Sequence, residues 1–220
     1  MASKLIQIIY DESQREKCYT FAEVYFNEEL TIFFENSVIS KLVIDAQTDK
    51  IAVCSWKLYD KMKWYIGVPR EITPELLESD YEVLSFTKNT KHHRMFEAAE
   101  NWHKGFVDIF NKVCDATGIR FTGEVKNPIY QNHFSAKTDI YKDYVTTYLN
   151  PVMELMENDP EINKMVMTNS NYSKLVKSTP EEIERLKQKI GIDYYPIAPF
   201  LLERLFSVYL QNKNINVSWL

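Results

Sequence analysis

Glycine is scarce in this chain, with 5 among 220 residues. The closest pair, Gly118 and Gly123, is followed by Glu124 and not by Lys with Ser or Thr. The sequence therefore has neither a phosphate-binding P-loop nor a dinucleotide-binding fingerprint. It also lacks the patterns C-x-x-C, H-E-x-x-H and G-x-S-x-G. Those absences disfavour the common zinc sites and the strained turn that carries a serine nucleophile.

Cysteine, basic runs and long apolar runs are also rare. Cys18, Cys54 and Cys114 are odd in number and far apart, which is typical of reduced thiols in an intracellular protein. The net charge is −5 and no Lys/Arg run exceeds two residues, so a nucleic-acid partner is disfavoured. No stretch approaches the roughly 18 apolar residues of a membrane span, and the first ten residues do not resemble a signal peptide. We expect a cytoplasmic protein with at most peripheral membrane contact.

The residues that are present predict one α/β domain over 1–220. With 45% apolar and 14% aromatic residues, the chain can bury a core. β-branched runs alternate with helical stripes, which favours a mostly parallel, Rossmann-like sheet flanked by helices. Ligands of such sheets bind beyond the carboxyl ends of the strands. The expected strands are 5–10, 51–56, 81–86 and an edge strand at 215–219; the expected helices are 29–43, 98–113, 140–156, 179–191 and 199–210.

Capping residues and prolines indicate where the expected helices begin, end or break. Thr73 with Pro74, and Thr179 with Pro180, are typical helix starts, and Gly118 is a suitable helix end. Pro151 should kink or restart the helix that contains it. The polar segment 157–178 is expected to be a loop, either beside an active site or as a plain surface connection.

Acidic pairs offer few candidate sites. Asp11 and Glu12 directly follow the first expected strand, where they could hold a nucleotide base or ribose, or simply form a polar loop. The acidic residues at 78–82 precede a strand and should lie at the opposite end. Cys54 and Ser55 end an expected strand and could supply a nucleophile, but the sequence indicates no general base beside them.

Two polar segments stand out in the last third of the chain. Residues 127–134 concentrate amide, imidazole and phenol groups of the kind that bind sugar hydroxyls; alternatively, Asn132 and His133 cap the turn before the helix at 140. In the last helix, Glu203 and Arg204 are expected on the polar face with Ser207, where a solvated ion pair would also explain them.

These segments resemble bacterial glycosyltransferase-like proteins of capsule and O-antigen polysaccharide loci. The resemblance rests on residues 131–137, followed by Ile140, Tyr141 and Tyr144, and on residues 199–210 with Phe-x-x-Glu-Arg-Leu at their centre. Residues 102–106 and shorter pieces at 27–35, 51–56 and 80–89 are also similar. The resemblance implies a GT-A-like fold with a nucleotide-binding half over 1–90 and an acceptor half over 91–220.

The resemblance also implies roles for individual residues. Glu203 would be catalytic or bind the acceptor, and Arg204 would orient it or pair with the diphosphate of the donor. Donor contacts would lie near Asp11 and Glu12. Contacts to the sugar or acceptor would come from Asn132, His133, Trp102 and His103.

The metal is the main departure from that family pattern. Mn²⁺ or Mg²⁺ would suit a diphosphate donor, yet the sequence has no D-x-D pair, and His92, His93 and His103 lack metal-site spacing. The resemblance implies transfer of a hexose from a nucleotide-sugar to a glycan acceptor. A carbohydrate- or nucleotide-binding module without activity is the alternative, and a scaffolding protein is a third reading.

Overall fold

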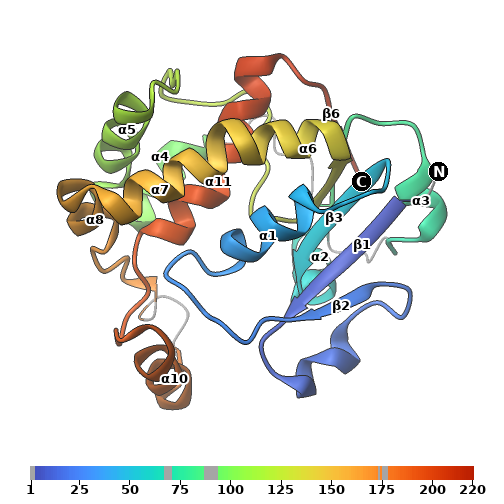
Figure 1. The fold of residues 1–220 in the computed structure, drawn as a ribbon, viewed down its shortest axis with the longest axis horizontal. Coiled ribbons are helices and arrows are strands. Elements are labelled where there is room, and N and C mark those ends of the chain that lie inside the picture. The colour runs from blue at the N-terminus through green and yellow to red at the C-terminus, as the bar shows by residue number, and fades with distance from the viewer. Residues whose placement is uncertain (1–2, 67–70, 87–93, 173, 175–177) are drawn as a thin grey trace.

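The computed structural model describes residues 3–66, 71–86, 94–172, 174 and 178–220, with only the backbone of 63–66. It is an α/β fold built on one mixed sheet with helices on both faces (Figure 1). The strands are β1 (Ser3–Ile9), β2 (Glu23–Phe26), β3 (Lys50–Ser55), β4 (Val83–Ser85), β5 (Phe134–Lys137) and β6 (Val217–Trp219). The helices are η1 (Glu12–Lys17), α1 (Glu35–Ile44), α2 (Leu58–Ile66), α3 (Pro74–Glu78), α4 (Met95–Trp102), α5 (Phe106–Thr117), α6 (Thr138–Tyr144), η2 (Val145–Leu149), α7 (Asn150–Asn158), α8 (Pro160–Val166), α10 (Pro180–Ile190) and α11 (Ala198–Lys213).

The strand order is β2-β1-β3-β5-β4-β6. Strands β1, β2 and β3 are mutually parallel, and β4 is parallel to β6. Strand β5 runs antiparallel to both of its neighbours, β3 and β4. The expectation of a mostly parallel sheet is confirmed, and β6 is the expected edge strand. Strands β2 and β5 were not expected from the sequence.

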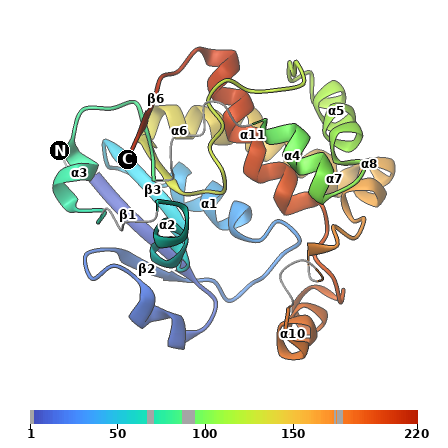
Figure 2. The ribbon, with the colours of Figure 1, turned by 180° about the vertical axis from the view of Figure 1, so that it is seen from behind.

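Burial on both faces explains the long apolar runs of the central strands. Successive side chains of a strand point to opposite faces, so Ile6 and Val53 join the larger core cluster while Leu5 and Cys54 join the smaller one. Helices α1, α6, α7 and α11 pack over the larger cluster (Figure 1), and α2 lies on the other face (Figure 2). No helix among the described residues is long and apolar enough to cross a membrane.

Helix α11 packs over β5 through an aromatic stack. The rings of Phe134 and Phe206 lie 4.0 Å apart between centroids with planes only 7° apart, an arrangement that adds to the burial energy of both side chains. Ser207 is 1% exposed, and its hydroxyl accepts from the Ile129 amide at 2.9 Å. The prediction that Ser207 lies on an exposed polar face of this helix is therefore wrong, because the loop that contains Ile129 covers it.

The helix expected over 98–113 is two helices. Helix α4 ends at Trp102, and Gly105, the residue before α5, has φ +82°, a left-handed conformation that separates the two helices. Glu100 stabilises the break, since its carboxylate accepts from the Gly105 amide at 2.7 Å and from the Val107 amide at 3.0 Å. The predicted end at Gly118 is confirmed, with φ +69°.

Two other helix predictions are refined. The helix expected around Pro151 contains a π-helical segment, η2, and α7 begins at Asn150 with Pro151 in its first turn, so the restart is confirmed. The expected loop at 157–178 is wrong for residues 160–166, which form α8 under an Asp159 cap. Thr179 and Glu182 form the capping box that opens α10, as the sequence indicated.

Replacing Gly105 with Ala should lower the free energy of unfolding by about 1–2 kcal/mol, because an L-residue is strained at this φ. No heavy atom lies within 4 Å of the added Cβ, so the loss would come from the backbone alone. Urea unfolding followed by circular dichroism measures it. Asn111→Ala, at an exposed position of α5, is the control and should stay within about 0.5 kcal/mol. Equal stability of Gly105→Ala and wild type would contradict the assigned break.

Candidate functional site

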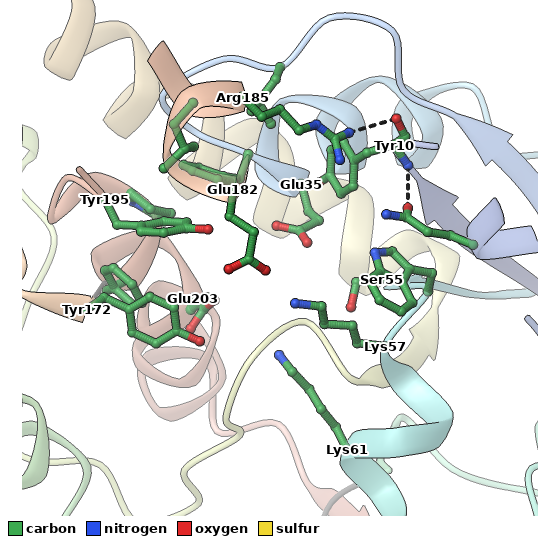
Figure 3. Close-up of a pocket in the computed structure, with 17 residues that line it drawn as sticks. Tyr10, Glu35, Ser55, Lys57, Lys61, Tyr172, Glu182, Arg185, Tyr195 and Glu203 are labelled. Atoms are coloured by element: carbon green, nitrogen blue, oxygen red, sulfur yellow. Dashed lines mark hydrogen bonds between the residues drawn. The ribbon is translucent and has the colours of Figure 1, made fainter. Parts of the chain in front are cut away.

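A pocket of about 210 Å³ lies at the carboxyl edge of β1 and β3. The chain passes from β1 to β2 on one side and returns to β3 on the other, so this is the switch point at which parallel sheets bind ligands. Tyr10 follows β1 and Ser55 ends β3 at this edge. Figure 3 shows the pocket, which is lined by Tyr10, Gln14, Leu30, Phe34, Glu35, Ser55, Trp56, Lys57, Lys61, Tyr172, Glu182, Arg185, Leu186, Tyr195, Pro199, Phe200 and Glu203.

Three helices complete the pocket from parts of the chain far apart in sequence. Glu35 is the first residue of α1, and Glu203 is in the second turn of α11. Helix α10 is attached across the opening, because Arg185 donates from Nη2 to the Tyr10 carbonyl at 2.7 Å. In Figure 3 the carboxylates of Glu35, Glu182 and Glu203 face a common space with the ammonium groups of two lysines.

Of those lysines, Lys57 directly precedes α2 and Lys61 lies in its first turn, where the Lys61 amide donates to the Lys57 carbonyl at 2.9 Å. The four-residue spacing places both on one side of the helix, and Figure 3 shows both side chains directed into the pocket. Lys57 is exposed and lies 5.2 Å from the ring centre of Trp56, whereas Lys61 is half-buried. Within the described part of the chain, neither ammonium has a hydrogen bond or an ion pair within 4 Å.

Glu203 has an altered acidity. Burial raises the pKa of its carboxyl above the ordinary 4.5, and the charge of Glu35 raises it further, while Lys61 and Arg204 oppose the shift. Burial likewise lowers the pKa of Lys61, together with the charge of Lys57, and Glu203 and Glu35 oppose that shift. A carboxyl with a raised pKa is better matched to proton transfer near neutral pH than an ordinary one.

Aromatic rings form one wall of the pocket. Tyr195 stacks on Phe34 with 5.6 Å between ring centres, and Tyr172 contacts Tyr195 at 5.2 Å and Phe200 at 5.0 Å. Burial raises the pKa of Tyr195, and the charge of Glu182 adds to it. Both hydroxyl groups point toward the polar space in Figure 3. Rings with polar edges suit a sugar or a nucleobase.

The carboxylates expected to contact a donor have local partners. Asp11 caps η1, its Oδ1 accepting from the Ser13 amide at 2.9 Å, and Glu12 forms an ion pair with Arg15 at 2.8 Å. Both are exposed and outside the pocket lining, because the turn into η1 directs them away. Their assignment as donor contacts stays a prediction, and Tyr10 occupies the position beside the pocket.

The amide-rich segment reaches the same edge because β5 is antiparallel. Asn132 donates from Nδ2 to Asn36 Oδ1 at 3.4 Å, beside the first residue of α1. His133 is 2% exposed, and burial lowers the pKa of its imidazole well below 6.5, helped by the charge of Lys61. His133 is buried outside the pocket lining, and its Nδ1 has no hydrogen-bond partner among the described residues. Sugar contact by either residue stays a prediction.

The remaining predicted residues are not in the pocket lining. Trp102, the last residue of α4, is 58% exposed and lies outside the pocket lining. His103 is buried, and its Nδ1 lies 2.7 Å from the Ser170 carbonyl oxygen. Arg204 donates to the Phe200 carbonyl and lies 4.9 Å from the ring centre of Phe106. Trp102 and His103 thus lie outside the lining of the pocket that contains Glu203, and their contact with a sugar or acceptor stays a prediction.

The acidic residues around 80 lie where the sequence indicated. Glu78 and Asp80 line a separate hollow with Ser3 and Lys50, at the amino ends of the strands. At the other end, Ser55 reaches the main pocket, while Cys54 is fully buried and burial raises the pKa of its thiol. The structure thus offers no activated thiol at that position.

Metal-binding side chains do not cluster in the part of the chain that the structure describes. No group of three His, Cys, Asp or Glu residues there could hold a metal ion. His92 and His93 lie outside the described residues. The three pocket glutamates come from α1, α10 and α11 and face a common space, but among the described residues they do not form a metal-binding group.

Comparisons with protein-family models, with curated proteins and with solved structures found no match to this chain. Of the residues that line this pocket, Glu203 was named as a site residue from the sequence, whereas Lys57, Lys61, Glu35 and Tyr10 were not. The lysine pair had a signal, because two lysines four residues apart follow a strand that was correctly predicted. Glu35 and Tyr10 had none, since their position depends on how α1 and α10 pack over the edge of the sheet.

Glu203→Gln should become more stable relative to wild type as pH rises. The native pKa exceeds the ordinary 4.5, so the stability from the protonated carboxyl is complete below pH 4.5 and is lost as pH rises through the native pKa. Glutamine has no such loss. Urea unfolding between about pH 4 and pH 8 measures the difference, with the exposed Glu154→Gln as the matched control. A stability difference that does not change with pH would contradict the assigned shift.

Proposed function

We propose that this protein is a glycosyltransferase that moves a hexose from a nucleotide-sugar donor to a glycan acceptor, on a GT-A-like form of the α/β fold. One observation carries the proposal: a partly desolvated carboxyl, Glu203, and two lysines whose ammonium groups have no hydrogen bond or ion pair to any described residue line one pocket at the switch point of the sheet. Such a pocket combines a site for negative phosphate groups with a group able to take a proton.

The chemical properties of the pocket suit both parts of a nucleotide-sugar. Ammonium groups and the amino end of a helix favour phosphate oxygens. Carboxylates and tyrosine hydroxyls suit sugar hydroxyls, and the ring wall of Tyr172, Tyr195 and Phe200 offers flat apolar surface to a sugar or a base. The resemblance of residues 131–137 and 199–210 to glycosyltransferase-like proteins supports the same reaction class.

In the proposed reaction, an acceptor hydroxyl attacks the anomeric carbon of the donor. Glu203 accepts the hydroxyl proton as the new glycosidic C–O bond forms. The bond between the anomeric carbon and the diphosphate oxygen breaks, and the electron pair leaves with the nucleoside diphosphate. Fixed positive charge near that oxygen would stabilise the developing negative charge.

A binding module without catalysis is the second candidate. It is favoured by one observation, namely that carboxylates do not cluster into a metal site among the described residues. Such a module would use the same pocket, with the aromatic wall and lysines as its contacts. The two candidates differ only in turnover.

The protein should be titrated with UDP-, GDP- and CDP-sugars, with and without Mn²⁺, while thermal shift and release of nucleoside diphosphate are recorded. The transferase should be stabilised by one donor class and release its diphosphate, slowly to water and faster with a glycan acceptor. Binding of donors without release, even with acceptors present, would favour the module. The absence of any binding would reject both candidates.

Glu203→Gln should reduce transfer by about 10²–10⁴-fold, the usual contribution of a general base. Donor binding should persist, because glutamine has a similar shape and the residue is not assigned to the phosphates. Initial rates and donor affinity are measured side by side for this variant and for the control Glu154→Gln, which lies on the exposed side of α7. Full activity of Glu203→Gln would remove Glu203 from the proposed reaction.

A further inference from the structure

The charged groups of the pocket divide into those with protein partners and those without. Arg185 donates to the Tyr10 carbonyl at 2.7 Å, and Glu182 accepts from the Thr179 amide at 2.9 Å in the capping box of α10. Arg185 therefore attaches α10 to the end of β1, and Glu182 stabilises the start of α10. Lys57 and Lys61 have no comparable partner among the described residues, although both line the pocket.

We infer that Lys57 and Lys61 form the site for the diphosphate of the donor and supply the positive charge that a divalent cation would otherwise bring. This inference rests on the proposed function for the identity of the ligand as a nucleoside diphosphate. It assigns the leaving group to the start of α2 and not to Arg204, which contacts Phe106 and the Phe200 carbonyl.

The positions of the two lysines support a bridging role. Lys57 precedes the first residue of α2 and is exposed, whereas Lys61 lies one turn further and is half-buried. Lys61 is also the basic residue with the largest effect on the acidity of Glu203. The diphosphate would thus extend from the exposed Lys57 toward Lys61, and its sugar-linked oxygen would lie next to Lys61, where the acceptor can approach Glu203.

The cost of burying Lys61 is a second, independent indication. Removing an ammonium from water is unfavourable unless it is paired, and burial lowers the pKa of Lys61 for that reason. Glu203 and Glu35 offset part of this cost only through space, since no ion pair within 4 Å joins them to Lys61 in the described part of the chain. A bound diphosphate would complete the pairing, and the amino end of α2 would add its positive dipole.

The carboxylates of the pocket do not fit a shared metal ion. A divalent cation needs several oxygen ligands converging at about 2.0–2.6 Å, and no three acidic, His or Cys side chains among the described residues are so placed. Ammonium groups on the leaving oxygen do the same electrostatic work, because they neutralise the charge that develops when the anomeric C–O bond breaks.

The test is calorimetric titration of the full chain with UDP, GDP, CDP and inorganic pyrophosphate in EDTA, then with Mn²⁺. At least one nucleoside diphosphate should bind in EDTA. Lys61→Met and Lys57→Met should each weaken it at least about tenfold, as expected for loss of a charge-assisted contact. Lys61→Arg retains the charge and should retain most of the affinity. Lys41→Met, on the exposed side of α1, is the matched control and should bind like wild type.

The possible outcomes separate this inference from the proposed function. Sugar transfer that requires Mn²⁺, or nucleotide binding unaffected by Lys57→Met and Lys61→Met, would overturn the lysine site while the transferase stands. Lysine-dependent binding of nucleoside diphosphates without turnover would support the lysine site and reject the transferase. Equal losses in Lys61→Arg and Lys61→Met would also overturn the inference, since a role for the charge requires rescue by arginine. No binding of any probe would overturn both.

Discussion

The stack of Phe206 on Phe134 is the contact on which the arrangement of the pocket depends. Strand β5 lies between β3 and β4 in the sheet, and Phe134 is its first residue. The stack of Phe206 on Phe134 therefore fixes α11 over the middle of the sheet. Glu203 lies one turn before Phe206 on α11, and residues three apart share a side of a helix. The same apolar contact that closes the core therefore places a carboxyl over the sheet edge, beside Lys61.

Desolvation then determines the chemistry of that edge. Glu203 and Lys61 are both drawn toward their neutral forms, the acid by a raised pKa and the amine by a lowered one. In a site built only for stability, these two groups would approach and pair. They instead face an open space with the aromatic wall on one side, so the fold retains an electrostatic cost that a bound anion can relieve. Such retained costs are typical of functional sites.

Elements formed by interactions between residues close in sequence could be predicted, whereas elements that need distant partners could not. Thr179 and Glu182 form their capping box within one turn, and Gly118 ends α5 by its own φ, so local sequence was sufficient. Strand β5 was missed because four residues beside a polar segment form a strand only when β3 and β4 supply partners. Of the pocket lining, Glu203 was named through the resemblance, whereas Trp102, which the resemblance assigned to the same cleft, lies outside the lining.

The sequence by itself determined the α/β class, the central strands β1 and β3, most helices and the absence of the common phosphate-loop and zinc motifs, because these follow from apolar periodicity and short-range patterns. Only the tertiary structure decided which polar groups meet. Tyr10, Glu35, Lys61 and Glu203 are separated by up to 193 positions, and they share one pocket because parallel strands end at the same edge while β5 runs in the opposite direction. Their pKa shifts arise from that meeting, since burial and neighbouring charge depend on packing and not on local sequence.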